Sequence, residues 1–238
     1  MVSSDTEKLA LARPDQNKIQ NLFNAITSKY DFLNSLFSLG LDGYWRRRMV
    51  SLSLSGLEHS ILDLGVGTGK SLEAFLSAHQ FERAVGCDFS ENMLEAAGKR
   101  LGPKAELTVC DFHDLSFPEQ SFDIVTGSFI LRSVQNMDHF LSEAKRVLAP
   151  GGKAVFLELT RPANPVTWAL FKPYLKFYIP FVGRIFSRHD EAYQFLSESI
   201  RAFMTPEELK EKFLAAGFKT VSVKPLTFGA ATIIEGKL

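Results

Sequence analysis

Three carboxylates stand at the ends of three successive apolar runs, where each could bind a polar ligand. Asp63 comes two residues before a loop, residues 65–69, that carries three alternate glycines, and Asp88 and Asp111 end the next two runs. Glycines at such a place let the backbone turn sharply and approach a ligand, with the N–H groups of the following helix facing it. Asp88 comes 19 positions after the loop, where an acidic residue can accept hydrogen bonds from both hydroxyls of a ribose. The pattern favours a ligand that contains a nucleoside.

Two other ligands are compatible with part of this loop. A dinucleotide fingerprint requires G-x-G-x-x-G, but in Gly65-Val66-Gly67-Thr68-Gly69 the third glycine comes one residue early. Gly69-Lys70-Ser71 completes the end of a phosphate-binding G-x-x-x-x-G-K-S motif, which would indicate a nucleotide hydrolase. The opening residue of that motif would be Leu64 instead of glycine, and Asp63 would repel a polyphosphate.

S-adenosylmethionine (SAM) is a ligand that would use all three carboxylates. Asp63 can hold the ammonium group of its methionine part, directly or through water, and Asp88 can bind the ribose. Asp111 can accept a hydrogen bond from the adenine amino group, and Phe112 can pack against the adenine ring. The residues that we expect to bind the cofactor on these grounds are Asp63, Gly65, Gly67, Asp88, Asp111 and Phe112. Methyl transfer from SAM leaves S-adenosylhomocysteine and needs positioning rather than a metal, and no metal is expected.

The composition is that of an ordinary globular protein. The chain has 238 residues, with 27 Lys+Arg and 27 Asp+Glu, so its zero formal net charge gives no electrostatic reason to expect nucleic acid as a partner. Cys87 and Cys110 are interpreted as two cytosolic thiols instead of a disulfide framework, and the run 46–48 (RRR) as a solvated helix end. Residues 1–13 lack an apolar signal segment, and charges and prolines interrupt the apolar stretch 166–186. We therefore expect a soluble, cytoplasmic protein.

Short β-like runs alternate with helical runs, which predicts a parallel sheet covered by helices on both faces. The expected strands are 59–64, 84–87, 106–110, 122–126, 154–159, 220–223 and 231–235. The expected helices are 70–78, 91–101, 138–148 and one that begins after the capping residue Thr205 and ends at Gly217.

The remaining segments predict how the chain is organised around this sheet. We expect a flexible tail over residues 1–14 and a single domain over residues 15–238. Within the domain, residues 15–58 would form an N-terminal helical cap whose first helix is capped by Asp15. Residues 162–203, which are rich in aromatic side chains, would form an inserted helical lid.

Further motifs extend along almost the whole chain. They are 23–34 (FNAITSKYDFLN), 38–40 (SLG) with Trp45-Arg46, 122–129 (FDIVTGSF) with Leu131-Arg132, 146–152 (RVLAPGG), and 193–200 (YQFLSESI) with 216–218 (AGF). Through them the sequence resembles the ubiquinone/menaquinone biosynthesis C-methyltransferases (UbiE/MenG type) from about Asn21 to the C-terminus. The motif at 146–152 is common to many methyltransferases, whereas the one at 193–200 is much more specific to this family.

The resemblance implies a fold, a cofactor site and a reaction. The fold would be the class I methyltransferase fold, a doubly wound, mostly parallel seven-stranded α/β sheet with a reversed last strand. Thr68, Asp88, Asp111, Phe112 and Ser128 would contact SAM. The reaction would methylate a ring carbon of a prenylated quinol, either demethylmenaquinol or a ubiquinol precursor. A lipid amine acceptor of the phosphatidylethanolamine type and a SAM-binding subunit without catalysis are the alternatives. The oligomeric state stays open, with a homodimer as one option.

Arg132 and Tyr193 are the residues that we expect at the acceptor. A cation favours a phenolate, so Arg132 could lower the pKa of a ring hydroxyl and make the adjacent carbon nucleophilic. The alternative for Arg132 is a structural role in which it pairs with the N-terminal helix. Tyr193 could line the acceptor site or could be packed without contacting the acceptor.

Several departures from the family pattern point to the acceptor side of the site. Ile130, Ser133 and Phe228 differ from the residues typical of the family, and we expect all three near the acceptor. The aromatic stretch 166–186 either packs on its own domain or receives a prenyl tail at a membrane surface, with Lys172 among the residues near lipid headgroups. In the second case the protein would be peripheral at the inner membrane face.

Overall fold

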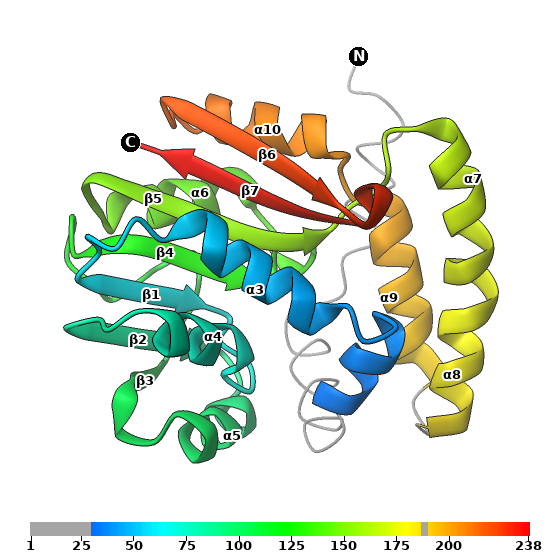
Figure 1. Cartoon of the computed structure of the whole chain (residues 1–238), viewed down its shortest axis with the longest axis horizontal. Helices are drawn as coiled ribbons and strands as arrows, with labels where there is room; N and C mark the ends of the chain where they lie inside the picture. The colour runs from blue at the N-terminus through cyan, green and yellow to red at the C-terminus, as the bar shows by residue number, and fades with distance from the viewer. Residues whose placement is uncertain (1–29, 187–189) are drawn as a thin grey trace.

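A single seven-stranded sheet with helices on both faces forms the centre of the molecule (Figure 1). The computed structural model describes residues 30–186 and 190–238. The strand order is β3-β2-β1-β4-β5-β7-β6, in which neighbours from β3 to β5 pair in parallel. β7 is reversed and runs antiparallel to both β5 and β6. The predicted class I methyltransferase fold is thereby confirmed.

The strands and sheet-covering helices follow the predicted alternation. The strands are β1 (Ser60–Leu64), β2 (Arg83–Asp88), β3 (Glu106–Val109), β4 (Phe122–Ser128), β5 (Leu148–Leu159), β6 (Thr220–Leu226) and β7 (Ala231–Lys237). The helices against the sheet are α3 (Asp42–Ser53), α4 (Lys70–Ala78), α5 (Glu91–Leu101), α6 (Met137–Arg146) and α10 (Pro206–Ala215). Short 3-10 turns are η1 (Gly102–Lys104), η2 (Leu131–Ser133) and η4 (Thr227–Gly229).

The starts of α5 and α10 match the predicted capping residues, whereas the predicted end of α6 and start of β5 are wrong. The Ser90 side chain accepts a hydrogen bond from the Met93 N–H, so α5 begins where the sequence predicts. Thr205 and Glu208 form the reciprocal capping box of α10. The helix α6, however, ends at Arg146, and β5 begins at Leu148 instead of residue 154. The reason is a register shift of the β4–β5 pair, which lets the intervening residues remain part of the strand.

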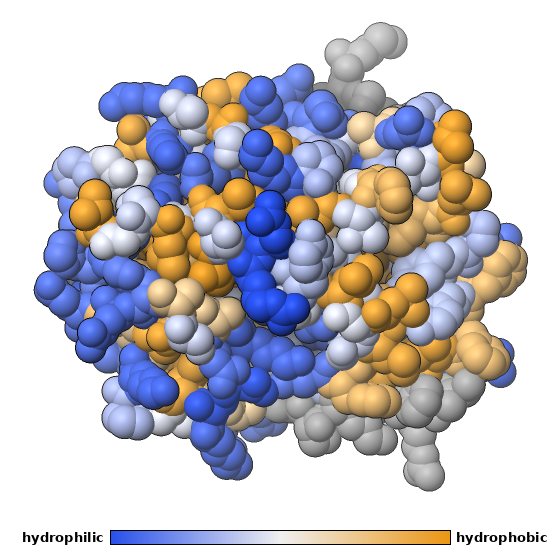
Figure 2. Space-filling view, in the orientation of Figure 1, coloured by the Kyte–Doolittle hydropathy of each residue, from blue (hydrophilic) through white to orange (hydrophobic). Residues whose placement is uncertain are grey.

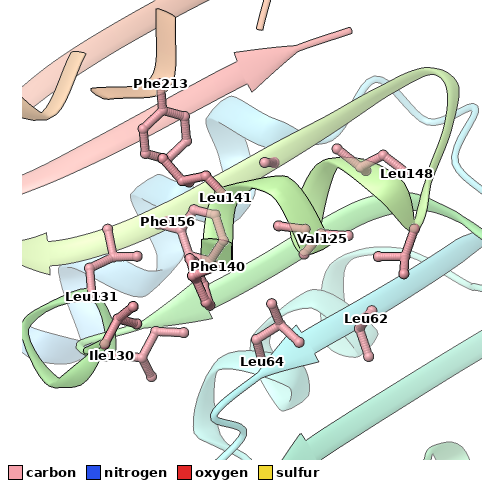
Figure 3. Packing of buried hydrophobic residues seen from close by; sticks show 14 of the residues in the cluster. Leu62, Leu64, Val125, Ile130, Leu131, Phe140, Leu141, Leu148, Phe156 and Phe213 are labelled. Atoms are coloured by element: carbon pink, nitrogen blue, oxygen red, sulfur yellow. The ribbon is translucent and has the colours of Figure 1, made fainter. Parts of the chain in front are cut away.

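Two apolar cores lie on opposite faces of the sheet. On one face, residues of α6 and α10 such as Phe140 and Phe213 pack against Leu62 of β1 and Phe156 of β5 (Figure 3). On the other face, α3, α4 and α5 cover the sheet, with Phe75 fully buried. Because β1, β2 and β4 are covered on both sides, they are buried at almost every position, as in other parallel sheets.

The aromatic stretch and the residues after it fold into helices on the side of the sheet toward which the parallel strands point (Figure 1). They are α7 (Pro165–Pro173), the π-helical turn η3 (Tyr174–Tyr178), α8 (Ile179–Phe186) and α9 (Asp190–Ala202). Their inner side buries Leu175 and Ile179 against Leu33 and Ile200. Pro173 has no N–H to donate, and the helix widens into the π-turn directly after it.

Part of the predicted N-terminal cap lies outside the described residues. This applies to the tail over residues 1–14 and to the helix that Asp15 would cap. Residues 30–37 are helical and lead into α3. In residues 30–186 and 190–238, no helix combines the length and the apolar character that crossing a membrane requires.

Candidate functional site

The glycine loop connects β1 to α4 with its backbone in the left-handed region. Gly65, Gly67 and Gly69 have φ values of 65°, 53° and 87°. A Cβ atom on Gly65 would lie 2.3 Å from Cγ2 of Ile130 and 3.5 Å from Cζ of Phe112. The loop therefore needs glycine both for its conformation and for its close packing. The same contact shows that Phe112, one of the predicted cofactor residues, lies next to the loop.

Asp88 ties the end of β2 to this loop. Its carboxylate accepts hydrogen bonds from the backbone N–H groups of Gly67 at 2.9 Å and of Ser90 at 3.0 Å. Burial raises the pKa of Asp88, and the N–H groups of Ser90 and Gly67 oppose this by favouring the charged form. The predicted contact of Asp88 with a ribose stays a prediction. The structure shows that the same carboxylate also fixes the loop.

Asp63 is a buried carboxylate without a hydrogen-bond partner in the described part of the chain. It is 1% exposed, and neither of its carboxylate oxygens makes a hydrogen bond. Its pKa is raised to about 7, mainly by burial; Arg46 opposes this rise, Asp88 contributes to it, and the nearby Leu72 N–H in the first turn of α4 opposes it. Such a group is costly unless a cation pairs with it. The ammonium group of a SAM molecule would supply that pair, so the residue fits the predicted cofactor.

Asp111 and Phe112 follow β3 at the same edge of the sheet as Asp88. Asp111 is largely exposed and accepts hydrogen bonds from the backbone N–H of His113. The ring of Phe112 meets Phe89 and Phe140 edge-on, with centroids 6.3 Å apart in both pairs. An exposed carboxylate beside an aromatic ring fits the predicted adenine contact, which stays a prediction.

The interpretation of the two cysteines as separate thiols is wrong. Cys87 and Cys110 form a disulfide, with Cα atoms 5.7 Å apart. Cys87 is in β2 and Cys110 directly follows β3, and these two strands pair in parallel. Cys87 lies near the end of β2 and Cys110 just after the end of β3, so the pairing of these strands brings the two residues together, which the spacing of 23 residues alone did not reveal. The bridge joins the two strand ends that carry Asp88 and Asp111.

Thr68 connects the glycine loop to the N-terminal segment. Its hydroxyl donates a hydrogen bond to Asp31 at 2.6 Å, and Arg100 donates to the same carboxylate at 2.5 Å. Lys70 lies 3.8 Å from Asp31. Sequence analysis assigned no role to Asp31, although it lies within the 23–34 motif. Lys70, the lysine of the phosphate-loop alternative, is thus held beside carboxylates.

Ser128 at the end of β4 belongs to a buried polar chain. Its hydroxyl accepts from Ser71 at 2.8 Å, and Ser71 accepts from Nε of Arg46 at 3.0 Å. Arg46 also donates to Asp42 at 2.6 Å. The interpretation of the 46–48 run as a solvated helix end is therefore wrong for Arg46, which is buried. The next two arginines are exposed as predicted, but the run lies inside α3 and not at its end. A helix that packs on the sheet turns one residue in three or four inward, and Arg46 occupies that position.

Arg132 lies in η2 and is held by two elements at once. Its Nε donates to Glu158 of β5 at 2.7 Å, and its Nη1 donates to Ser199 of α9 at 2.8 Å. The Glu158 side chain is fully buried, and that of Arg132 is 8% exposed. The alternative role for Arg132 is a pairing with the N-terminal helix. In the described residues, the side chain of Arg132 instead pairs with Glu158 of β5 and Ser199 of α9. Tyr193 belongs to α9, but its side chain lies outside the described residues.

An apolar cavity of about 620 Å³ opens beside Arg132. Its wall includes Tyr30 and Trp45 from the N-terminal part and Phe171 from α7. Among the three departures from the family pattern, Ser133 and Phe228 line this cavity. Ile130 does not, because its side chain points at Gly65 and Gly127 and packs into the core. The expectation that Ile130 lies near the acceptor stays a prediction, although Ile130 is not part of the wall of this cavity.

Comparison with known proteins relates this arrangement to one family. The family model described as the ubiE/COQ5 methyltransferase family matches residues 12–237. A demethylmenaquinone methyltransferase of Thermotoga maritima is 39% identical over 91% of this chain and 94% of its own. A ubiquinone/menaquinone biosynthesis C-methyltransferase UbiE of Desulfotalea psychrophila is 35% identical over 92% of this chain and 89% of its own.

Solved structures share the fold at low sequence identity. A SAM-dependent methyltransferase of Thermotoga maritima superposes with a TM-score of 0.65 at 20% identity, covering 91% of this chain and 98% of that one. The phosphoethanolamine N-methyltransferase 2 of Haemonchus contortus, in complex with SAM, gives 0.57 at 21% identity, covering 79% of this chain and 39% of that one. With a family model that spans nearly the whole chain and close relatives over nine tenths of it, this protein belongs to the ubiE/COQ5 methyltransferase family.

Proposed function

We propose that this methyltransferase transfers the methyl group of SAM to a ring carbon of a prenylated quinol, either demethylmenaquinol or a ubiquinol precursor. The observation that carries the proposal is the apolar cavity of about 620 Å³ that places Arg132 in its wall. The names of the relatives, demethylmenaquinone methyltransferase and UbiE C-methyltransferase, support the same acceptor class.

The cofactor would lie across the carboxyl ends of β1, β2 and β3. Asp63 would hold the ammonium group, Asp88 the ribose, and Asp111 with Phe112 the adenine, while Gly65 and Gly67 leave room for the ligand. Thr68 and Ser128 would complete this set. When bound, SAM supplies an electrophilic methyl group on a sulfonium. The chain's own part is to hold the acceptor carbon in line with that group and to exclude water.

Arg132 would act on the acceptor through a hydrogen bond. Its charge is already balanced by Glu158, and its hydrogen bonds to Glu158 and Ser199 use Nε and Nη1. Within the described residues this leaves Nη2, a donor that can point at a ring hydroxyl. Donation to the oxygen favours the phenolate and so raises electron density on the neighbouring carbon. Tyr193 of α9 remains a second proposed acceptor residue.

The acceptor assignment is tested by label transfer. Purified protein is incubated with methyl-labelled SAM and three acceptors: a reduced demethylmenaquinone analogue, a ubiquinol precursor analogue, and phosphatidylethanolamine. Label on a quinol ring carbon is the expected result. Label on the lipid amine alone would overturn the quinol assignment, and SAM binding without any transfer would favour a non-catalytic subunit.

Arg132 is tested by separating cofactor binding from turnover. Arg132→Ala should leave the Kd for SAM nearly unchanged while kcat falls by about 100-fold, the order expected for a lost electrostatic stabiliser. Arg161→Ala removes an arginine that pairs with Glu208 at the surface and serves as the control. Equal losses of SAM affinity and turnover in Arg132→Ala would contradict the role.

The outer side of α7, η3 and α8 supports the proposal of a peripheral contact with a membrane. Leu170, Phe177 and Phe181 are 76%, 64% and 63% exposed. Figure 2 shows apolar residues gathered on the side of the molecule where these helices lie. Lys172 and Lys176 lie over aromatic rings at this surface, as expected for side chains that reach toward lipid headgroups. Flotation with anionic liposomes should be lost in a Phe177→Ser/Phe181→Ser variant, and undiminished flotation would contradict the contact.

A further inference from the structure

Backbone strain is concentrated at the apolar cavity. In the described residues, five residues other than glycine have a positive φ: Leu39, Gln120, Phe129, Thr227 and Phe228. All of these except Gln120 line the cavity. Bulky side chains rarely adopt this backbone conformation, and strain of this kind gathers at ligand clamps, where the surrounding structure enforces it.

Two of the strained residues place large apolar side chains in solvent. Phe228 has φ 56° and ψ 25° and is 88% exposed. Leu39 has φ 53° and is 63% exposed. Because both are exposed and also line the cavity, they lie at its rim. Neither strain nor exposure stabilises the protein by itself, so something else must favour these side chains at these places.

The turn that carries Phe228 is held in place from several sides. Trp45 donates a hydrogen bond from its indole N–H to Oγ1 of Thr227 at 2.8 Å. Thr160 donates to the carbonyl of Gly229 at 3.0 Å. The N–H of Ala230 donates to the carbonyl of Thr227 at 3.1 Å. The Phe228 backbone is thus fixed, and its side chain is presented at a defined position on the rim.

We propose that Phe228 and Leu39 form an apolar clamp on the hydrocarbon tail of the acceptor and thereby make the enzyme select ring substrates that carry such a tail. The clamp rests on the proposed function. Pockets of 300–1,000 Å³ hold ligands of about drug size, so a cavity of about 620 Å³ takes the ring with the first part of its tail. A longer tail must cross the rim, where it covers the two exposed side chains.

The clamp is tested by binding, which does not require turnover. The probes are 1,4-naphthoquinone and its derivative with a chain of two isoprene units, and calorimetry gives both dissociation constants. Phe228→Gly removes the side chain and lets the turn adopt its backbone without strain. The Kd for the isoprenoid probe should rise about tenfold, the factor expected when roughly half of a Phe side chain's burial is lost, while the Kd for the tail-less probe stays unchanged.

Matched variants separate the clamp from a folding defect. The apo protein with Phe228→Gly should unfold at the same or a higher temperature than wild type. Phe228→Leu keeps most of the apolar area and should retain affinity for the isoprenoid probe. Leu57→Gly removes another apolar side chain, 80% exposed and outside the cavity lining, and should change neither constant.

Each outcome decides between the clamp and other roles. Equal losses for both probes in Phe228→Gly would mean that Phe228 contacts the ring, and unchanged constants for both would mean that it contacts no ligand; either result overturns the clamp. Tighter binding of the isoprenoid probe by wild type, lost in Phe228→Gly, supports the clamp even if no quinol is methylated. In that case only the proposed reaction fails.

Discussion

Replacing Asp63 by Asn should stabilise the cofactor-free protein above neutral pH while weakening SAM binding. The carboxyl has a pKa of about 7 in the fold against 3.8 as the reference for the unfolded chain. A folded pKa above the unfolded value means that the fold prefers the protonated form. The associated stability is fully present below pH 3.8 and is lost as the pH rises to about 7. Above that, the fold holds an unpaired charge.

The magnitude follows from the shift. About 3 pKa units, the difference between about 7 and 3.8, at 1.36 kcal/mol each give a penalty of about 4 kcal/mol for wild type at pH 8. At pH 5, which is about 1 pH unit above the pKa of the unfolded chain, the penalty is about 1.5 kcal/mol. Asn is nearly isosteric and carries no charge. Its advantage over wild type should therefore grow by about 2–3 kcal/mol between pH 5 and pH 8.

Urea unfolding of cofactor-free wild type and Asp63→Asn at pH 5 and pH 8 measures the difference in their free energies of unfolding. Calorimetry measures the affinity of each protein for SAM. Loss of the ammonium partner should raise the Kd for SAM by about 100-fold, as for one half of a buried charge pair. Asp123→Asn is the control, because Asp123 accepts from the N–H groups of His59 and Ser60 and should not stabilise at any pH when replaced. An Asp63→Asn variant less stable than wild type at pH 8 would refute the reasoning.

Three further predictions concern the supports of the site. Reducing the Cys87–Cys110 bridge should lower the free energy of unfolding by about 3 kcal/mol, given its separation of 23 residues; urea curves that coincide with and without dithiothreitol would contradict this. Glu158→Gln should lower it by about 3 kcal/mol because Arg132 loses its buried counter-charge, measured by the same assay, and a change below about 1 kcal/mol would argue against a buried pair. Thr205→Ala should lower it by about 1 kcal/mol through loss of the α10 cap, with no change in SAM affinity by calorimetry; an unchanged unfolding curve would count against the capping box.

The sequence predicts those parts of the structure that local rules determine. The helices 70–78 and 91–101 match α4 and α5 because a glycine or a serine cap marks each start. The alternation of strands and helices also predicts that the loops after β1, β2 and β3 lie at one edge of the sheet. It places Asp63, Asp88 and Asp111 at one edge because parallel strands end on the same side of a sheet.

Other features depend on contacts between distant residues, which one sequence does not reveal. The Arg132–Glu158 pair joins residues 26 positions apart through two different elements. The disulfide required the pairing of β2 with β3, and the inward direction of Arg46 required the packing of α3. Asp31, which binds the glycine loop through Thr68, had no spacing signal of its own. In each case the partner is chosen by the fold and not by a local pattern.

Features that lower the stability of the fold are concentrated at two places in the molecule. Their chemistry indicates which ligand groups would stabilise each place. A buried carboxylate without a hydrogen-bond partner in the described residues lies beside the glycine loop, and left-handed backbone at Leu39, Phe129, Thr227 and Phe228 surrounds the apolar cavity. In the rest of the described chain, Gln120 is the remaining residue other than glycine with a positive φ, and α5, α6 and α10 begin at side-chain caps. Consistent sequences break such rules mainly where function requires it. A cation would pair with the carboxylate of Asp63, and an apolar tail would cover the strained, exposed residues at the cavity rim. We therefore expect both the cofactor and the acceptor to stabilise the protein when they bind.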